Sequence, residues 1–132
     1  MEKIETLIAH NDFNIRNNIL QTINHLDYVE VIGTANNAEE TYSKIINLKP
    51  DIVFAEYRKT DSISIIRKSK EKLDNSVPVF NFIINGKNIE DNELKEAIHV
   101  LGNKMNSLVS EPINDVVIYI LKEYKERQVN TK

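Results

Sequence analysis

Short runs of consecutive apolar residues alternate along this chain with segments in which apolar residues recur every three or four positions. An uninterrupted apolar run is typical of a strand that is covered on both faces of a parallel sheet, whereas the wider spacing predicts a helix with one apolar side. Repeated alternation of the two patterns favours parallel strands that are joined by right-handed helical crossovers. We therefore predict a three-layer α/β sandwich.

The predicted strands occupy residues 4–9, 29–35, 52–55, 77–84 and 105–109. The predicted helices carry their apolar faces within residues 15–26, 38–48, 63–72, 94–101 and 113–124. We expect Asp12 to cap the first helix and Asn36 or Asn37 to cap the second, because these side chains accept hydrogen bonds from the free N–H groups of a first helical turn. Pro50 should end the second helix and Gly102 the fourth.

The composition indicates one soluble globular domain. The chain has 132 residues, of which 41% are hydrophobic and 28% charged, and its net charge of −3 argues against binding to a nucleic-acid backbone. No segment approaches the ~20 apolar residues of a membrane span, and the charged start does not fit a signal peptide. The chain lacks cysteine, which excludes disulfides and thiolate metal sites. We expect a cytoplasmic protein with a domain at 1–126 and a polar tail at 127–132.

Polar side chains follow the first and third predicted strands. His10, Asn11 and Asp12 come directly after the first, and Glu56 follows the third. Because the carboxyl ends of parallel strands lie at one edge of the sheet, where ligands bind in open α/β folds, we expect these four residues to gather in a single pocket.

Four segments resemble the receiver domain of two-component response regulators, at residues 3–9, 29–33, 48–53 and 77–79. The sequence Val-Glu-Val-Ile-Gly at 29–33 is most similar to the receiver of the stage-zero sporulation regulator. The resemblance covers residues 3–124. It implies a flavodoxin-like (CheY-like) fold, in which a doubly wound five-stranded parallel sheet of order 2-1-3-4-5 is flanked by five helices.

The resemblance also implies five positions that perform phosphoryl transfer in a working receiver. In the family, two acidic residues and an Asp hold Mg²⁺, that Asp accepts the phosphoryl group, and a Thr or Ser and a Lys stabilise it. Here the acidic pair falls on His10 and Asn11, and the phosphoacceptor falls on Glu56. The hydroxyl position falls on Ile83 and the Lys position on Glu111. None of the five carries the family's residue.

These replacements predict that phosphoryl transfer is lost. Mg²⁺ prefers carboxylate oxygens in near-octahedral geometry, and Glu56 with Asp12 is a poor substitute for the missing pair. Glu56 is one methylene longer than Asp, and about 1 Å of misplacement can cost on the order of 10²-fold in rate. Glu111 puts a negative charge where a cation is needed, and one lost electrostatic donor costs roughly 10²–10³-fold. We expect no bound Mg²⁺, no other cofactor and no enzymatic activity.

Two pocket residues have alternative interpretations. Glu56 could mimic a phosphorylated acceptor, but we favour a carboxylate that has lost its role, because Ile83 lacks the hydroxyl that senses the charge in the family. His10 could form a pH-sensitive ion pair with Glu56. We favour the simpler interpretation, a polar residue at a strand end that finds its hydrogen bonds locally. His25 and His99 show no ligand spacing and are expected on helices or at the surface.

The predicted function is that of a stand-alone pseudo-receiver, a protein-interaction module in two-component or phosphorelay signalling, with sporulation as one setting. Its partner would be a sensor kinase, another response regulator or a second copy in a homodimer, without direct contact to nucleic acid or membrane. The resemblance implies that a receiver dimerises or binds partners through its fourth helix, fifth strand and fifth helix. The exposed edge of the fifth helix, with Tyr119, Lys122 and Glu123, is therefore the candidate surface. The alternatives are a receiver that still switches, through atypical phosphorylation or a small ligand at the former acidic pocket, and a fragment of a longer transcription regulator.

Overall fold

The structure is a computed structural model that describes residues 2–84, 105–109 and 113–130. These residues form a five-stranded parallel sheet of order β2-β1-β3-β4-β5. The strands are β1 (Ile4–Ala9), β2 (Val29–Ala35), β3 (Ile52–Glu56), β4 (Val79–Ile84) and β5 (Met105–Val109). The helices are α1 (Phe13–Ile23), α2 (Ala38–Leu48), α3 (Lys59–Leu73) and α5 (Ile113–Asn130), with a 3-10 turn η1 (Asp74–Ser76). The predicted α/β fold class and strand order are confirmed.

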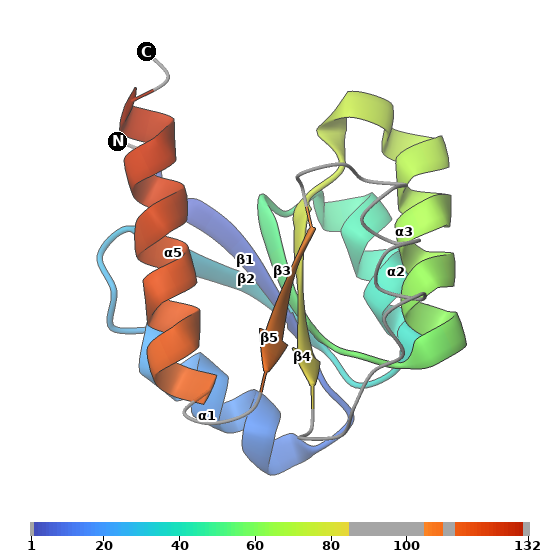
Figure 1. Ribbon diagram of the computed structural model, residues 1–132, viewed down its shortest axis with the longest axis horizontal. Helices are drawn as coiled ribbons and strands as arrows, with labels where there is room; N and C mark the ends of the chain where they lie inside the picture. The colour runs from blue at the N-terminus through green and yellow to red at the C-terminus, as the bar shows by residue number, and fades with distance from the viewer. Residues whose placement is uncertain (1, 85–104, 110–112, 131–132) are drawn as a thin grey trace.

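Helices cover both faces of the sheet (Figure 1). The helices α1 and α5 pack side by side on one face, and α2 and α3 pack on the other. None of the helices in the described ranges is long and apolar enough to cross a membrane. The predicted helix at 94–101 and the end of that helix at Gly102 lie outside the described residues.

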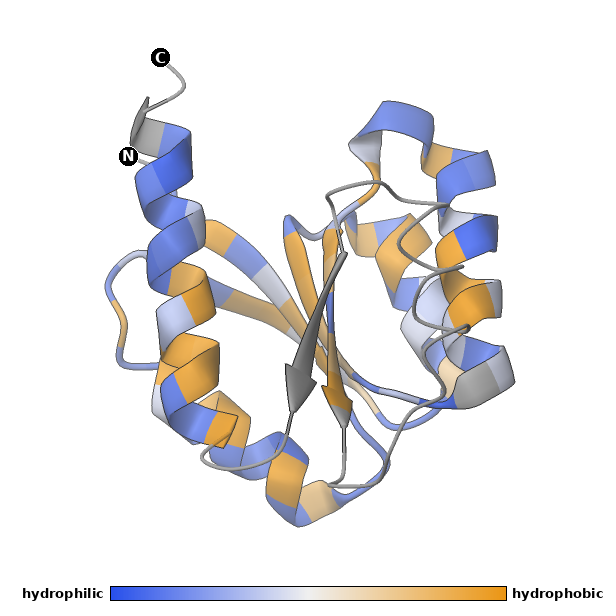
Figure 2. Cartoon of the chain, viewed as in Figure 1, coloured by the Kyte–Doolittle hydropathy of each residue, from blue (hydrophilic) through white to orange (hydrophobic). Residues whose placement is uncertain are grey.

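The core is divided by the sheet into two apolar clusters. On β3, Ile52 and Phe54 point toward α1 and α5, whereas Val53 and Ala55 point toward α2 and α3. All four side chains are buried. This two-sided burial explains why the β3 segment is apolar without interruption, and the apolar residues of the strands and inner helix faces are visible together in Figure 2.

The helix boundaries follow from their caps. Asp12 caps α1 as predicted, and Asn37 caps α2 by accepting a hydrogen bond from the N–H of Glu40 at 2.7 Å. Lys49 adopts a left-handed conformation (φ 50°) just before Pro50, and α2 ends there. The last helix differs from the prediction, since residues 127–130, the first four of the predicted polar tail, continue α5.

Candidate functional site

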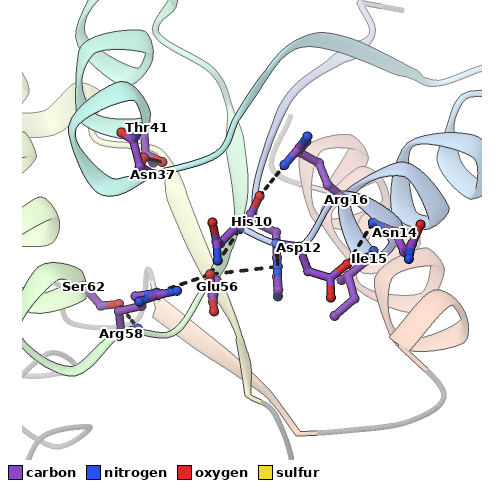
Figure 3. Close-up of polar contacts among 11 residues, drawn as sticks. His10, Asp12, Asn14, Ile15, Arg16, Asn37, Thr41, Glu56, Arg58 and Ser62 are labelled. Atoms are coloured by element: carbon purple, nitrogen blue, oxygen red, sulfur yellow. Dashed lines mark hydrogen bonds and ion pairs between the residues drawn. The ribbon is translucent and has the colours of Figure 1, made fainter.

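The carboxyl ends of β1 and β3 bring the predicted pocket residues together (Figure 3). The two strands are paired in register up to Ala9 and Ala55. Residues 10–12 and Glu56 therefore leave the sheet at the same level. Their arrangement follows from the parallel sheet and was predictable from the sequence.

Glu56, the predicted equivalent of the phosphoacceptor, is bound by groups of the chain itself. Its Oε1 accepts a hydrogen bond from the backbone N–H of Asn11 at 3.1 Å. The same oxygen lies 3.4 Å from Nε of Arg58 and 3.9 Å from Nδ1 of His10. The Glu56 side chain is only 18% exposed. Part of its negative charge is thus neutralised by a neighbouring guanidinium and a backbone donor.

His10 is buried, with 3% of its surface exposed. Its Nδ1 accepts a hydrogen bond from the backbone N–H of Asp12 at 3.0 Å, so in this arrangement the ring proton belongs to Nε2. Nε2 has no hydrogen-bond partner among the residues that the structure describes. The backbone carbonyl of His10 accepts a hydrogen bond from Nη1 of Arg16 at 2.6 Å. His10 therefore combines features of both interpretations: local hydrogen bonding at one nitrogen and a position within ion-pair distance of Glu56.

Burial lowers the pKa of the His10 imidazole below its ordinary value. The carboxylates of Glu56 and Asp12 raise that pKa, and the guanidinium groups of Arg58 and Arg16 lower it. Burial is the largest of these effects, so the pKa of His10 is lowered overall, in keeping with the hydrogen bond that its Nδ1 accepts.

The pocket residues do not fit a Mg²⁺ ion, which needs free oxygen ligands. Oδ1 of Asp12 accepts hydrogen bonds from the first turn of α1, His10 offers a nitrogen that is already bonded, and Asn11 presents a backbone donor to Glu56. Arg58 places a cation beside the remaining carboxylate. Within the described ranges, no three His, Cys, Asp or Glu side chains gather as a metal-binding group. The absence of Mg²⁺ binding stays a prediction.

The two remaining family positions differ in what the structure shows. Ile83 pairs with Glu56 across β3 and β4 and is buried, with 1% exposure, in the apolar cluster beneath α1 and α5. The equivalence of Ile83 to the family's hydroxyl position stays a prediction. Glu111 lies outside the described residues.

The candidate partner surface lies on α5. Tyr119 is 62% exposed, Lys122 is exposed and Glu123 is partly exposed. The Glu123 carboxylate is hydrogen-bonded to Tyr119 and raises the pKa of its phenol. A second exposed aromatic residue, Phe13 at the start of α1, is 64% exposed, and Arg16 lies 5.5 Å from its ring centroid. Sequence reasoning missed Phe13, although its position next to the cap and outside the apolar helix face was a usable signal.

A small cavity of about 30 Å³ adjoins Glu56. Asn37 and Thr41 from the start of α2 line one side, and Arg58 and Ser62 from the start of α3 line another. The sequence pattern predicted Asn37 only as a helix cap and gave no signal for Thr41, Arg58 or Ser62, because the pocket was expected from the residues that follow strands.

Several solved structures share this arrangement. The signal receiver domain of NarL from Mycobacterium tuberculosis is 15% identical over 96% of this chain and 98% of that chain, with a TM-score of 0.77. The response regulator domain of CheB from Thermotoga maritima is 16% identical over 95% and 96%, with a TM-score of 0.76. The REC domain of AraT, a response regulator from Geobacillus stearothermophilus, is 19% identical over 96% of each chain, with a TM-score of 0.71.

The chain has the receiver fold. Identities of this size establish the fold alone. No family model matches the chain, and no curated protein matches it. What the receiver fold does here therefore has to be argued from the pocket itself.

Proposed function

We propose that this protein is a pseudo-receiver, a module that is not phosphorylated at Glu56 and that acts by binding another signalling protein rather than as an enzyme. The observation that supports this proposal is the engagement of Glu56 Oε1 by the N–H of Asn11 and its position 3.4 Å from the Arg58 guanidinium. A carboxylate attacks phosphorus through an oxygen lone pair, and a hydrogen bond and a nearby cation both withdraw electron density from that oxygen.

The surroundings of Glu56 reinforce this argument. Phosphoryl transfer depends mainly on electrostatic stabilisation by metal ions and donors that are fixed before the reaction. Asp12 uses its Oδ1 to cap α1, and Ile83 contributes only hydrocarbon. Neither residue supplies what a transferred phosphoryl group needs.

The proposed partner is a sensor kinase or another response regulator, with a homodimer as the further option. The proposed contact surface is the edge of α5 that carries Tyr119, Lys122 and Glu123, because an exposed aromatic ring flanked by charged groups is typical of a protein-binding surface. The resemblance of residues 29–33 makes the sporulation phosphorelay the first pathway to test.

Phosphorylation is tested by incubating the chain with a small phosphodonor and Mg²⁺ and measuring its intact mass. We expect no phosphoryl adduct on the wild-type chain or on Glu56→Gln. An adduct that appears on the wild type and is removed by Glu56→Gln would contradict the proposal.

Partner binding is tested by using the chain as bait in extracts of its native cell and measuring the affinity of the captured kinase or regulator. We expect Glu56→Gln to bind as the wild type does and Tyr119→Ala to bind more weakly. Gln21→Ala, a change at an exposed position on α1, is the matched control. Binding that requires prior treatment with a phosphodonor would show that the chain still works as a switch.

A second candidate function is a response to a small ligand in the cavity beside Glu56. The polar lining by Asn37, Thr41 and Ser62 favours this function, with a small polar ligand as the occupant. Saturable NMR shifts of the Thr41 and Ser62 amides on titration with formate or inorganic phosphate would support it, and unchanged amides would eliminate it.

A further inference from the structure

We propose that His10 is a pH-dependent latch on the turn between β1 and α1. In the unprotonated state, Nδ1 of His10 accepts a hydrogen bond from the Asp12 N–H. On protonation the imidazole releases that group and turns to Glu56, and the orientation of the first turn of α1 changes. This inference does not depend on the proposed function.

The unprotonated arrangement ties down consecutive donors of the turn. The N–H of Asn11 is bonded to Glu56 Oε1 at 3.1 Å, and the N–H of Asp12 is bonded to His10 Nδ1 at 3.0 Å. Arg16 reaches back from α1 and binds the His10 carbonyl at 2.6 Å. The turn is thus fixed from β3, from α1 and from the imidazole itself.

Protonation is incompatible with this arrangement. A proton on Nδ1 would face the N–H of Asp12, and two donors cannot bond to each other. The Glu56 Oε1 atom, 3.9 Å away, is an acceptor that a modest movement of the ring would bring to the ~2.7–2.9 Å of a charge-assisted hydrogen bond. That oxygen already accepts from Asn11, so a new bond to His10 must share it or displace the Asn11 N–H.

Among the described residues, the charged groups that face His10 are Glu56 at the end of β3, Arg58 before α3, Asp12 at the cap of α1 and Arg16 within α1. The carboxylates favour the imidazolium, and the guanidinium groups and burial oppose it. Because burial is the largest effect, the pKa of His10 is lowered, and the latch is predicted to open only below the pH at which an exposed histidine titrates.

Release of the Asp12 N–H by His10 affects the molecular surface, because Asp12 connects the turn to the start of α1. Its backbone N–H is the group that His10 holds, while its carboxylate caps α1 through the N–H groups of Asn14 and Ile15. Phe13 follows directly and is 64% exposed. A shift of Asp12 therefore changes the orientation of an exposed aromatic ring.

The test is an NMR titration of the full chain from mildly alkaline to mildly acidic pH. We expect the His10 imidazole to titrate below the ordinary histidine pKa, and the amide protons of Asn11 and Asp12 to shift with the His10 midpoint. His25→Gln, a change at an exposed position, should leave those amide shifts unchanged. The proposal is overturned if His10 titrates at or above the ordinary histidine pKa, or if the two amides do not follow His10.

Two variants separate the latch from a general effect of acid. His10→Gln should abolish the shared midpoint of the Asn11 and Asp12 amides. Glu56→Gln, which keeps His10, should move the midpoint to lower pH, because it removes the carboxylate that favours the imidazolium. An unchanged or raised midpoint in Glu56→Gln would contradict the proposed movement of His10 toward Glu56.

Discussion

Asn81, in the middle of β4, is fully buried, and neither atom of its side-chain amide has a hydrogen-bond partner within the described part of the chain. By the alternation of the strand it lies on the same face as Val79 and Ile83, beneath α1 and α5. A buried amide without partners costs free energy that an apolar side chain of similar size would not. The sequence pattern showed Asn81 as an interruption of an apolar strand, but only the structure shows that its amide has no partner among the described residues.

Replacing Asn81 should stabilise the protein. We expect Asn81→Leu to raise the free energy of unfolding by about 1–2 kcal/mol, because it removes the unpaired amide and adds apolar burial. Urea denaturation measures the change. Asn81→Asp, which buries a charge at the same place, should lower the free energy of unfolding. A loss of stability in Asn81→Leu would mean that the amide is bonded in solution.

His10 makes stability depend on pH in a defined direction. Its pKa is lowered in the folded chain, so the unfolded chain takes up the proton first as pH falls. The contribution of His10 to the free energy of unfolding is fully present above the ordinary histidine pKa and is lost as the pH drops through the pKa of His10 in the folded chain. We expect the free energy of unfolding, measured by denaturation at a series of pH values, to fall more steeply in the wild type than in His10→Gln over this window. Equal slopes would contradict this account.

Among the elements, the strands were the most predictable part of the chain. The segments at 4–9, 29–35 and 105–109 form strands with the predicted limits. The predicted strand at 77–84 begins two residues later, at Val79, because Val77 closes the turn η1 and Pro78 has no N–H to donate to a neighbouring strand.

The pocket was predictable only in part. Residues that follow strands converge because the strands are parallel, and so His10 and Glu56 could be placed from the sequence. The pairing of Arg58 with Glu56, and the positions of Thr41 and Ser62 in the cavity lining, depend on how α2 and α3 pack against the sheet. Periodicity fixes which face of a helix is buried but not which residues of its first turn meet the neighbouring helix.

The Asp12 cap of α1 contributes to the stability of the protein. Asp12→Ala should lower the free energy of unfolding by about 1 kcal/mol, because the N–H groups of Asn14 and Ile15 lose their acceptor. Asp12→Asn should cost much less, since Asn is an equally good cap. Thermal denaturation of both variants measures the difference. Equal losses would mean that the Asp12 charge, rather than its role as a cap, matters.

For the molecule as a whole, the receiver fold is present, and we propose that its pocket does not perform phosphoryl transfer. The Asp12 carboxylate caps α1. The Glu56 carboxylate pairs with Arg58 and accepts a hydrogen bond from the Asn11 N–H. The fold therefore still presents surfaces such as the exposed edge of α5, and the pocket serves to hold the turn between β1 and α1. On this account, binding to a partner does not require phosphorylation.

The most direct measurement of this claim is an NMR titration of the full chain with Mg²⁺ and beryllofluoride, which together imitate a phosphorylated receiver. The variant with His10→Asp, Asn11→Asp and Glu56→Asp adds two carboxylates to the pocket and shortens the third by one methylene. It is the matched comparison and should show saturable shifts around the pocket. We predict that the wild-type amides of Asn11, Glu56 and Ile83 do not shift in a saturable way. Saturable shifts in the wild type that Glu56→Gln removes would contradict the account.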